Sequence, residues 1–381
     1  MQQRLPVLAL VGTAGLVVLT LVAIVLWLEL SSDVVTEEMR SSRPQVNVRM
    51  IGSKKHVAGS ATAGEQAKGQ DADDADVGSA AKDAEHAEDN AAHKDSEAGQ
   101  ERQVPDTAGK AQTVLHPHPD PQLVEKTDIG PLPIIGKDGR QPWRVYSRPF
   151  NALEKRPRVA IVMVGLGVSF NATESAVADL PGEVTLSFEP FSEKLDEWIT
   201  AARGAGHEVL LNLPMEPQGY PRNDPGPTAL MTGYQPDENK RRLEWLMSRM
   251  SGYVGVTNFQ GNRFAGNKIV LLPVLRNLAR RGLMFVDTVD YTLSAIPVSA
   301  AELKMPLALK SVLVDEVANR AAIEKKLSVI QKIASQGGAA VIIARPYPVS
   351  IRLLKRWIST MGDQGLVLAP VSAVANRQKF E

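Results

Sequence analysis

The chain has 381 residues, with 43 basic and 43 acidic side chains and no cysteine. The lack of cysteine excludes disulfides, thiolate metal sites and a cysteine nucleophile, and the zero formal net charge gives no global attraction to nucleic acid. Apolar residues make up 44% of the chain, which is enough for a globular core but excludes a protein that crosses a membrane many times.

An uncharged apolar stretch, residues 5–28, lies near the start of the chain. As a helix with a rise of about 1.5 Å per residue it would be about 36 Å long, which is enough to span a bilayer. A cleavable secretory signal has a shorter apolar region, about 7–15 residues, that ends in a small-residue cleavage site, and no such site follows Trp27. Residues 1–30 are therefore predicted to be an uncleaved transmembrane signal anchor.

Charges on the two sides of this stretch predict its orientation. Arg4 precedes it, whereas Asp33, Glu37 and Glu38 follow it. The positive-inside rule then puts the N-terminus in the cytoplasm and the rest of the chain outside. We expect a single-pass protein of the inner (cytoplasmic) membrane, with its C-terminal domain in the periplasm.

Residues 31–156 are predicted to form a disordered acidic linker rich in alanine and glycine. Residues 65–100 hold 11 acidic and three basic side chains and no aromatic one. Such a segment cannot bury enough apolar surface to offset the entropy of ordering. Trp143, Tyr146 and Phe150 are the first aromatic residues after residue 30, and we expect them to dock the end of the linker onto the following domain.

Five of the six histidines lie in this linker, among them His116 and His118, each followed by proline. Proline forces the preceding residue into an extended conformation, and no further ligand is nearby, so this motif does not predict a metal site. The sixth, His207, directly precedes a predicted strand, and we interpret it as a structural or surface histidine.

Residues 157–381 are predicted to form the folded domain, in which apolar runs alternate with amphipathic stretches. The predicted strands are 159–164, 184–188, 208–213, 253–257, 284–287, 311–314, 339–344 and 366–369, with helical patterns between them. This alternation is typical of a parallel sheet covered by helices, and the number of strands favours an α/β fold of the (β/α) barrel type, regular or irregular and seven-stranded. A doubly wound open sheet is the alternative. No Gly-x-Gly-x-x-Gly follows the first strand, so a dinucleotide cofactor is not predicted.

Chemistry in such a barrel occurs at the carboxyl ends of the strands, and polar residues occupy those positions here. These carboxyl ends form the rim of the barrel, and the rim also includes Glu189 after the second strand. We predict substrate-binding roles for Asn212, Asn258, Arg263, Asp315 and Arg345, because amides and carboxylates bind sugar hydroxyls and arginine binds carboxylates or phosphates.

Carboxylates are the candidate catalytic groups, because the rim contains no histidine. Asp287 could act with Glu216 or Asp315 as an acid/base pair. The alternative for each is an ordinary surface or loop-capping carboxylate. We predict no metal ligand and no cofactor, since a two-histidine metal site is excluded inside the domain.

Several segments of the domain together resemble the divergent polysaccharide deacetylases, a branch of the glycoside hydrolase/deacetylase β/α-barrel superfamily. They are 159–167 (VAIVMVGLG), 180–185 (LPGEVT), 206–217 (GHEVLLNLPMEP), 223–227 (NDPGP), 255–258 (GVTN), 261–264 (GNRF), 281–287 (RGLMFVD), 346–348 (PYP) and 368–372 (LAPVS). Their order and spacing carry the resemblance, and no single segment does.

The resemblance implies a barrel whose metal-binding members have paired aspartates after the first strand and histidines after later strands. A metal-activated water would then attack an acetyl group on a glycan, with a carboxylate as base. Val164 and Gly165 stand where the aspartates would be, and Phe259 and Arg345 stand where histidines would be. Asp287 and Glu216 match family positions.

The resulting prediction is a polysaccharide deacetylase-like domain that acts in envelope carbohydrate metabolism without the usual histidine metal site. A non-catalytic glycan-binding module and an envelope scaffold protein are the alternatives. The expected partners are an envelope polysaccharide or peptidoglycan fragment and, through the N-terminal helix, the membrane, but not nucleic acid. The zero net charge is a cancellation, because residues 1–156 carry 18 basic and 22 acidic side chains and residues 157–381 carry 25 and 21.

Overall fold

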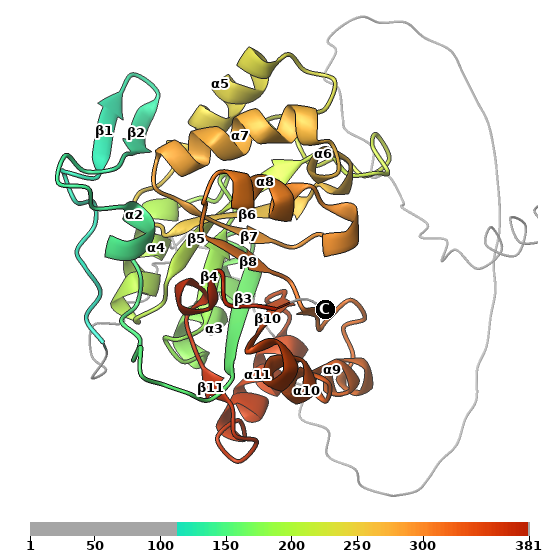
Figure 1. Ribbon diagram of the computed structural model, residues 1–381. Helices are drawn as coiled ribbons and strands as arrows, with labels where there is room; N and C mark the ends of the chain where they lie inside the picture. Colours follow the sequence, from blue (N-terminus) through green and yellow to red (C-terminus); the bar gives the residue numbers. More distant parts are fainter. Residues whose placement is uncertain (1–112, 380–381) are drawn as a thin grey trace, which may run out of the picture. The chain divides into compact units, whose positions relative to one another are not determined.

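The computed structural model describes residues 113–379, and its centre is one parallel sheet (Figure 1). The strand order is β8-β7-β6-β5-β4-β3-β10-β9, and β11 pairs with β3 beside this path. The strands are β3 (Arg158–Leu166), β4 (Thr185–Phe188), β5 (Val209–Met215), β6 (Gly255–Gln260), β7 (Met284–Asp287), β8 (Leu307–Leu309), β9 (Val312–Leu313), β10 (Ala339–Ala344) and β11 (Val367–Leu368).

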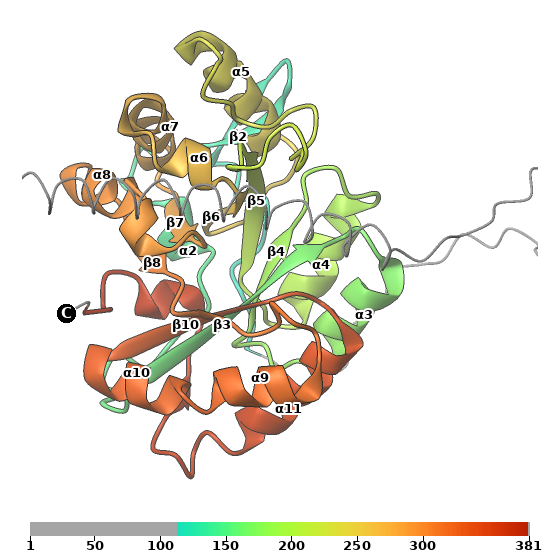
Figure 2. The same cartoon turned by 90° about the vertical axis from the view of Figure 1, so that its right-hand side faces the viewer.

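Helices cover the outer face of this curled sheet, with α5, α7 and α8 near one end and α9, α10 and α11 near the other (Figure 2). The helices that follow the first strand of the sheet are α3 (Phe170–Asp179), α4 (Leu195–Gly204), α5 (Pro236–Met247), α6 (Asn262–Ala265), α7 (Lys268–Arg280), α8 (Ile296–Glu302), α9 (Arg320–Leu327), α10 (Ile330–Gly337) and α11 (Pro348–Ser359), with short 3₁₀ turns η1 (Tyr291–Leu293) and η2 (Val371–Val374).

The strands have two buried faces, as their nearly continuous apolar sequence predicts. In β3, Ile161 and Met163 belong to the outer core, under the helices. Ala160 and Val162 alternate with them and belong to a separate inner core. Side chains on the inner face therefore point toward the interior of a half-barrel, and polar residues on that face near the carboxyl edge are placed together.

The fold class is confirmed as a parallel curled sheet of the (β/α) barrel type, but the described sheet does not close. The strands β8 and β9 are consecutive in the chain, yet β8 pairs with β7 and β9 pairs with β10, and no pairing joins the two. Both are short, at three and two residues, so little backbone is available to bridge the gap. The strand β8 was missed in the sequence, because its three residues, 307–309, are too short a run to show a strand pattern, although Pro306 separates them from the preceding helix.

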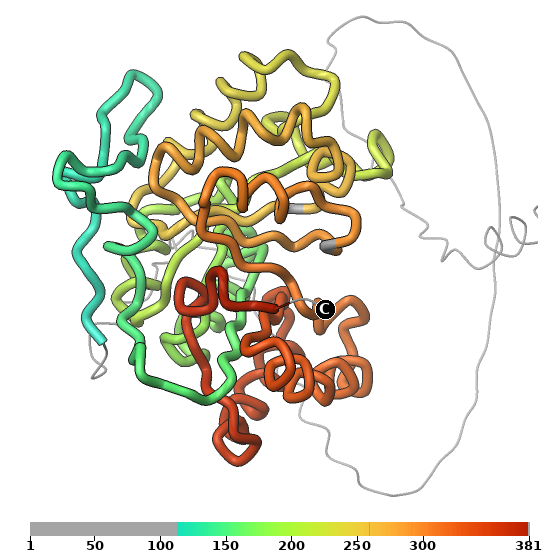
Figure 3. The backbone as a smooth tube through the Cα atoms, in the orientation of Figure 1, coloured from blue at the N-terminus to red at the C-terminus, as the bar shows by residue number. Residues whose placement is uncertain are grey.

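The predicted linker does not extend to residue 156, because residues 113–156 are folded. This segment, which we call the N-terminal strap, contains β1 (Val124–Thr127), β2 (Gly130–Pro133) and α2 (Pro142–Val145). In Figure 3 it runs along one side of the domain as the first coloured segment. Leu123 and Tyr146 of the strap belong to the inner core, whereas other apolar residues of the strap, such as Val114 and Leu153, are exposed. The expected docking by Tyr146 is confirmed, and the low density of apolar residues explains why the rest of the strap was not predicted.

Arg203 of α4 binds the strap to the barrel through backbone carbonyls. Its Nη1 donates to the oxygens of Tyr146 at 3.1 Å and Gly252 at 2.9 Å, and its Nη2 donates to the oxygen of His116 at 2.7 Å. The guanidinium lies 5.2 Å from the centre of the Tyr146 ring. Arg203 is 4% exposed, and burial lowers its pKa to about 10. Carbonyl oxygens thus make the direct contacts to its charge, and the carboxylate of Glu208 acts on it from a distance.

His118 of the strap makes the stability of the protein depend on pH. Burial, followed by the neighbouring Arg203, lowers its pKa to about 4, whereas an unfolded histidine titrates near 6.5. The unfolded chain therefore binds more protons between these two values, and stability is lost as the pH falls through this window. In His118→Gln, the loss of unfolding free energy between pH 7 and pH 5 should be smaller by about 1 kcal/mol.

Urea denaturation at the two pH values checks this expectation. At pH 8 His118 is neutral in both the folded and the unfolded chain, so its protonation adds nothing to the difference in unfolding free energy between the variant and the parent. Equal losses of unfolding free energy in the variant and the parent would contradict it.

None of the helices in the described part of the chain is long and apolar enough to cross a membrane. The predicted anchor, residues 1–30, lies outside the described residues.

Candidate functional site

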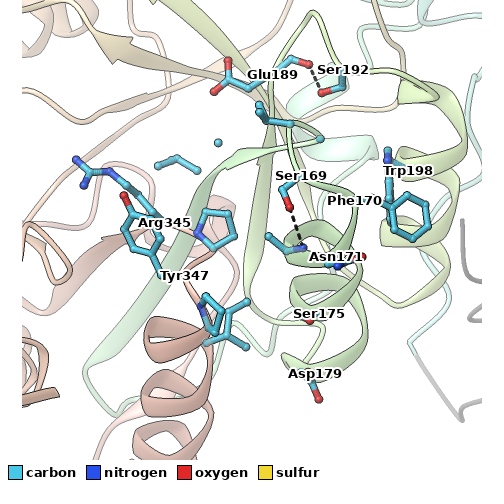
Figure 4. A pocket seen from close by; sticks show the side chains of 18 of the residues that line it. Ser169, Phe170, Asn171, Ser175, Asp179, Glu189, Ser192, Trp198, Arg345 and Tyr347 are labelled. Carbon is cyan, nitrogen blue, oxygen red and sulfur yellow. Dashed lines mark hydrogen bonds between the residues drawn. The ribbon is translucent and has the colours of Figure 1, made fainter. Parts of the chain in front are cut away.

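A groove of about 1540 Å³ lies at the carboxyl ends of β3, β4 and β10, between α3 and α11 (Figure 4). The end of β3 contributes Val164 and Gly165, and the segment after β4 contributes Glu189. Arg345, which follows β10, and Tyr347 line the side toward α11. This is the edge of the sheet where the sequence predicts the site.

Glycines shape the floor of the groove. The pairing of β3 with β4 shifts register between Met163 and Leu166, and Gly165 in this interval has a φ of +83°. Gly167 has a φ of +90°, and a Cβ there would lie 1.8 Å from Oγ of Ser192. Both positions therefore require glycine, and the backbone itself borders the groove where another residue would project a side chain.

Four polar side chains, which we call the interior polar row, lie beside the groove: Ser187, Glu189, Asn212 and Thr257. Asn212 follows the inner-core residue Leu210 by two positions and is paired in register with Thr257, so both face the barrel interior. Asn212 Nδ2 donates to Glu189 Oε1 at 2.6 Å. Within residues 113–379, the buried atoms Ser187 Oγ, Asn212 Oδ1 and Thr257 Oγ1 have no hydrogen-bond partner. Such groups require donors from water or from a ligand.

Burial raises the pKa of Glu189, and the hydrogen bond from Asn212 opposes this shift. A carboxyl group in this state exchanges protons at a higher pH than usual, and in its neutral form it can donate as well as accept. Glu189 is thus an acidic group of the groove with a raised pKa, beside Asp179 and Glu193, which also line it, and the sequence analysis put Glu189 on the rim without a role.

Asp315 holds Arg345 in place through the backbone. Its Oδ2 accepts from the Arg345 amide at 2.6 Å and from the Ser350 hydroxyl at 2.7 Å. Asp315 is fully buried, and burial raises its pKa. One carboxyl group therefore joins the segment after β9 to the end of β10 and the first turn of α11.

Asp287 is part of a separate buried network. Its Oδ1 accepts from Asn258 Nδ2 and from the amide of Val289, both at 3.0 Å. Asn258 Oδ1 in turn accepts from the amide of Thr288 at 2.7 Å. Burial raises the pKa of Asp287. This network ties the ends of β6 and β7 together, and none of its residues lines the groove.

Glu216 and Arg263 form a third cluster. Glu216 Oε2 accepts from the amide and the hydroxyl of Thr232, each at 2.6 Å, and Glu216 Oε1 lies 3.2 Å from Arg263 Nη1. Glu216 is 5% exposed at its side chain and Arg263 is 54% exposed. The pair connects the long loop after β5 to the loop after β6.

The structure therefore divides the predicted site residues among separate clusters. Arg345 lines the groove, Asn212 contacts it through Glu189, and Asp315 supports it. The carboxyl groups of the predicted acid/base pair have different hydrogen-bond partners: Asn258 for Asp287, Thr232 for Glu216 and Ser350 for Asp315. Their action as a pair stays a prediction. Sequence reasoning missed Ser187 and Thr257, whose only signal is a polar residue on the inner face of an apolar strand.

His207 lies at the amino end of β5, as the sequence predicts, and is structural. It is fully buried, with Nδ1 at 2.8 Å from the oxygen of Val184 and Nε2 at 3.2 Å from that of Val177. It takes no part in the groove, which lies at the other end of the strands.

The residues of the groove do not fit the metal that the family resemblance implies. The end of β3 presents the apolar Val164 and the backbone of Gly165, and the end of β10 presents the Arg345 cation. The described residues contain no group of three histidine, aspartate or glutamate side chains that could hold a metal ion. A guanidinium at a ligand position would repel a divalent cation, so these side chains do not support a step through a metal.

Comparison with known families and structures agrees with the fold. The family model described as "Divergent polysaccharide deacetylase" matches residues 161–375. The crystal structure of uncharacterized protein ATU2773 from Agrobacterium tumefaciens C58 is 37% identical, with a TM-score of 0.62, and the match covers 64% of this chain and 99% of that one.

Two curated bacterial proteins are also similar. Uncharacterized protein YibQ of Escherichia coli strain K12 is 24% identical over 227 residues, which cover 59% of this chain and 69% of YibQ. An uncharacterized protein of Haemophilus influenzae is 19% identical over 206 residues, which cover 54% of this chain and 72% of the relative.

Proposed function

Because the chain belongs to the divergent polysaccharide deacetylase family, we propose that its domain is a non-catalytic glycan-binding module of the cell envelope. It keeps the fold and the groove of the family and lacks the metal ligands that the family's hydrolytic chemistry needs. The predicted N-terminal anchor would hold the module at the periplasmic face of the inner membrane, where polysaccharide and peptidoglycan fragments are its expected ligands.

The groove at the carboxyl edge of β3, β4 and β10 is the observation that carries this proposal. Glu189 and Arg345 on its walls are both suited to bind sugar hydroxyls or acidic substituents. Phe191 and Tyr347, which also line it, are 48% and 37% exposed. Exposed aromatic rings beside polar side chains suit a sugar, which has an apolar face and a polar edge.

Titration of the full chain, purified in detergent, with soluble peptidoglycan fragments and acetylated oligosaccharides tests the proposal. We expect saturable binding, weakened about tenfold in Tyr347→Ala, with no acetate released above a denatured control at any zinc concentration. Ile269→Ala is the matched control, because Ile269 is 85% exposed and does not line the groove. Absence of binding to every fragment would refute the proposal.

An enzymatic alternative rests on Glu189. Its raised pKa and its place in the groove suit a general acid, and such a group can act without a metal. Release of acetate by the parent, lost in Glu189→Gln while oligosaccharide binding persists, would favour the enzyme over the binding module.

A further inference from the structure

The positive charge of Arg345 has no acidic partner in the described part of the chain. No carboxylate of residues 113–379 forms an ion pair with its guanidinium, and Asp315 bonds to its backbone amide instead. Burial raises the pKa of Asp315, and the charge of Arg345 opposes this shift without a direct ion pair between the two side chains. The half-buried guanidinium therefore faces the groove with its five donors available.

The opposite side of the groove offers oxygen atoms that can accept. Glu189 lines it directly, and Asn212, bonded to Glu189, has a buried Oδ1 without a partner in the described part. Asn212 is 1% exposed, so this orphaned acceptor is costly unless water or a ligand donates to it. The hydroxyls of Ser187 and Thr257 are in the same condition, but these two residues and Asn212 do not line the groove, so Glu189 is the member of the interior polar row that a ligand there would contact.

The floor between these two sides is open. A Cβ built on Gly165 would meet no atom within 4 Å, so the space above the end of β3 is not filled by the protein. A ligand of the size of a sugar ring could thus approach the backbone between Arg345 and Glu189.

We infer that this groove is a subsite for an acidic sugar, whose carboxylate pairs with Arg345 and whose hydroxyls donate to Glu189, which Asn212 holds in place from behind the lining. The inference rests on the proposed function and narrows it from glycans in general to uronic acid-type residues. Arginine at the position where the resemblance implies a neutral histidine ligand adds a positive charge at the end of β10, which favours an anion there over a cation. A planar guanidinium binds a carboxylate through two parallel hydrogen bonds, which accounts for arginine rather than lysine.

Binding of trigalacturonic acid and of neutral galactotriose to the full chain in detergent, measured by calorimetry, tests this inference. These ligands differ mainly at the carboxylates. We expect the acidic trisaccharide to bind at least about tenfold more tightly at low salt, and this preference to shrink as salt is added. In Arg345→Met the preference should disappear while the weak binding of galactotriose persists.

Two variants and one further ligand serve as controls. Arg345→Lys keeps the positive charge but loses the planar guanidinium that can form two parallel hydrogen bonds. It should retain only part of the preference for the acidic trisaccharide. Arg356→Met removes an exposed charge from α11, outside the groove, and should leave the preference unchanged. Inorganic phosphate should bind more weakly than trigalacturonic acid, because it has no sugar hydroxyls that could also donate to Glu189.

The outcomes separate the inference from the proposed function. Equal binding of the two trisaccharides, or an undiminished preference in Arg345→Met, would overturn the acidic subsite and leave glycan binding intact. Binding of phosphate alone would also overturn it, and failure of every glycan to bind would remove the proposed function as well.

Discussion

Replacement of Arg203 by methionine is expected to lower the free energy of unfolding by about 3 kcal/mol. The variant leaves the backbone carbonyls of Tyr146, Gly252 and His116 without the donor that each has now, and the first two of these bonds are buried. Each orphaned carbonyl costs about 1–3 kcal/mol, and relief from burying an unpaired guanidinium recovers only part of the sum.

Urea denaturation of the full chain at neutral pH measures this loss. Arg203→Lys should recover part of the stability, because one ammonium group cannot reach three carbonyls on separate segments. Arg276→Met, at an exposed position of α7, is the matched control and should change the unfolding free energy by less than about 0.5 kcal/mol. An unchanged midpoint in Arg203→Met would show that the strap is not held by this residue.

A chain that begins at Pro157 is expected to lose cooperative folding, whereas one that begins at Thr113 should keep it. Removal of the strap takes Leu123 and Tyr146 from the inner core, where they are 0% and 2% exposed. Burial of each of these side chains stabilises the folded state by about 1.5–3 kcal/mol, and the contacts of Arg203 are lost in addition. The total approaches the 5–15 kcal/mol by which domains are typically stable.

Near-ultraviolet circular dichroism and urea titration of the two truncated chains test this expectation. The longer chain should give a sharp sigmoidal transition and the shorter one a broad transition or none. A cooperative transition with the same midpoint in both would mean that the strap is an accessory segment and that the domain begins where the composition changes.

The alternation of apolar runs and amphipathic stretches was sufficient to predict most of the sheet. The strand predicted at 159–164 is β3, and that predicted at 339–344 is β10, because strands buried on both faces are continuous apolar runs. The strap escaped prediction because its order depends on contacts such as that of Arg203 with His116, which lie 87 residues apart. Local composition contains no information about such partners.

Residue types and positions along the chain were enough to indicate the class of fold, the edge of the sheet that carries the site and the presence of Arg345 on that edge. They also showed that the ligands of a metal-dependent deacetylase are missing. Which polar residues meet depended on strand register and on the curl of the sheet. Register and curl place Asn212 of β5 against Glu189, which follows the neighbouring strand β4. They keep Asp287 in a separate network with Asn258. Such neighbours arise from packing between distant segments, so they follow from the tertiary structure and not from spacing along the chain.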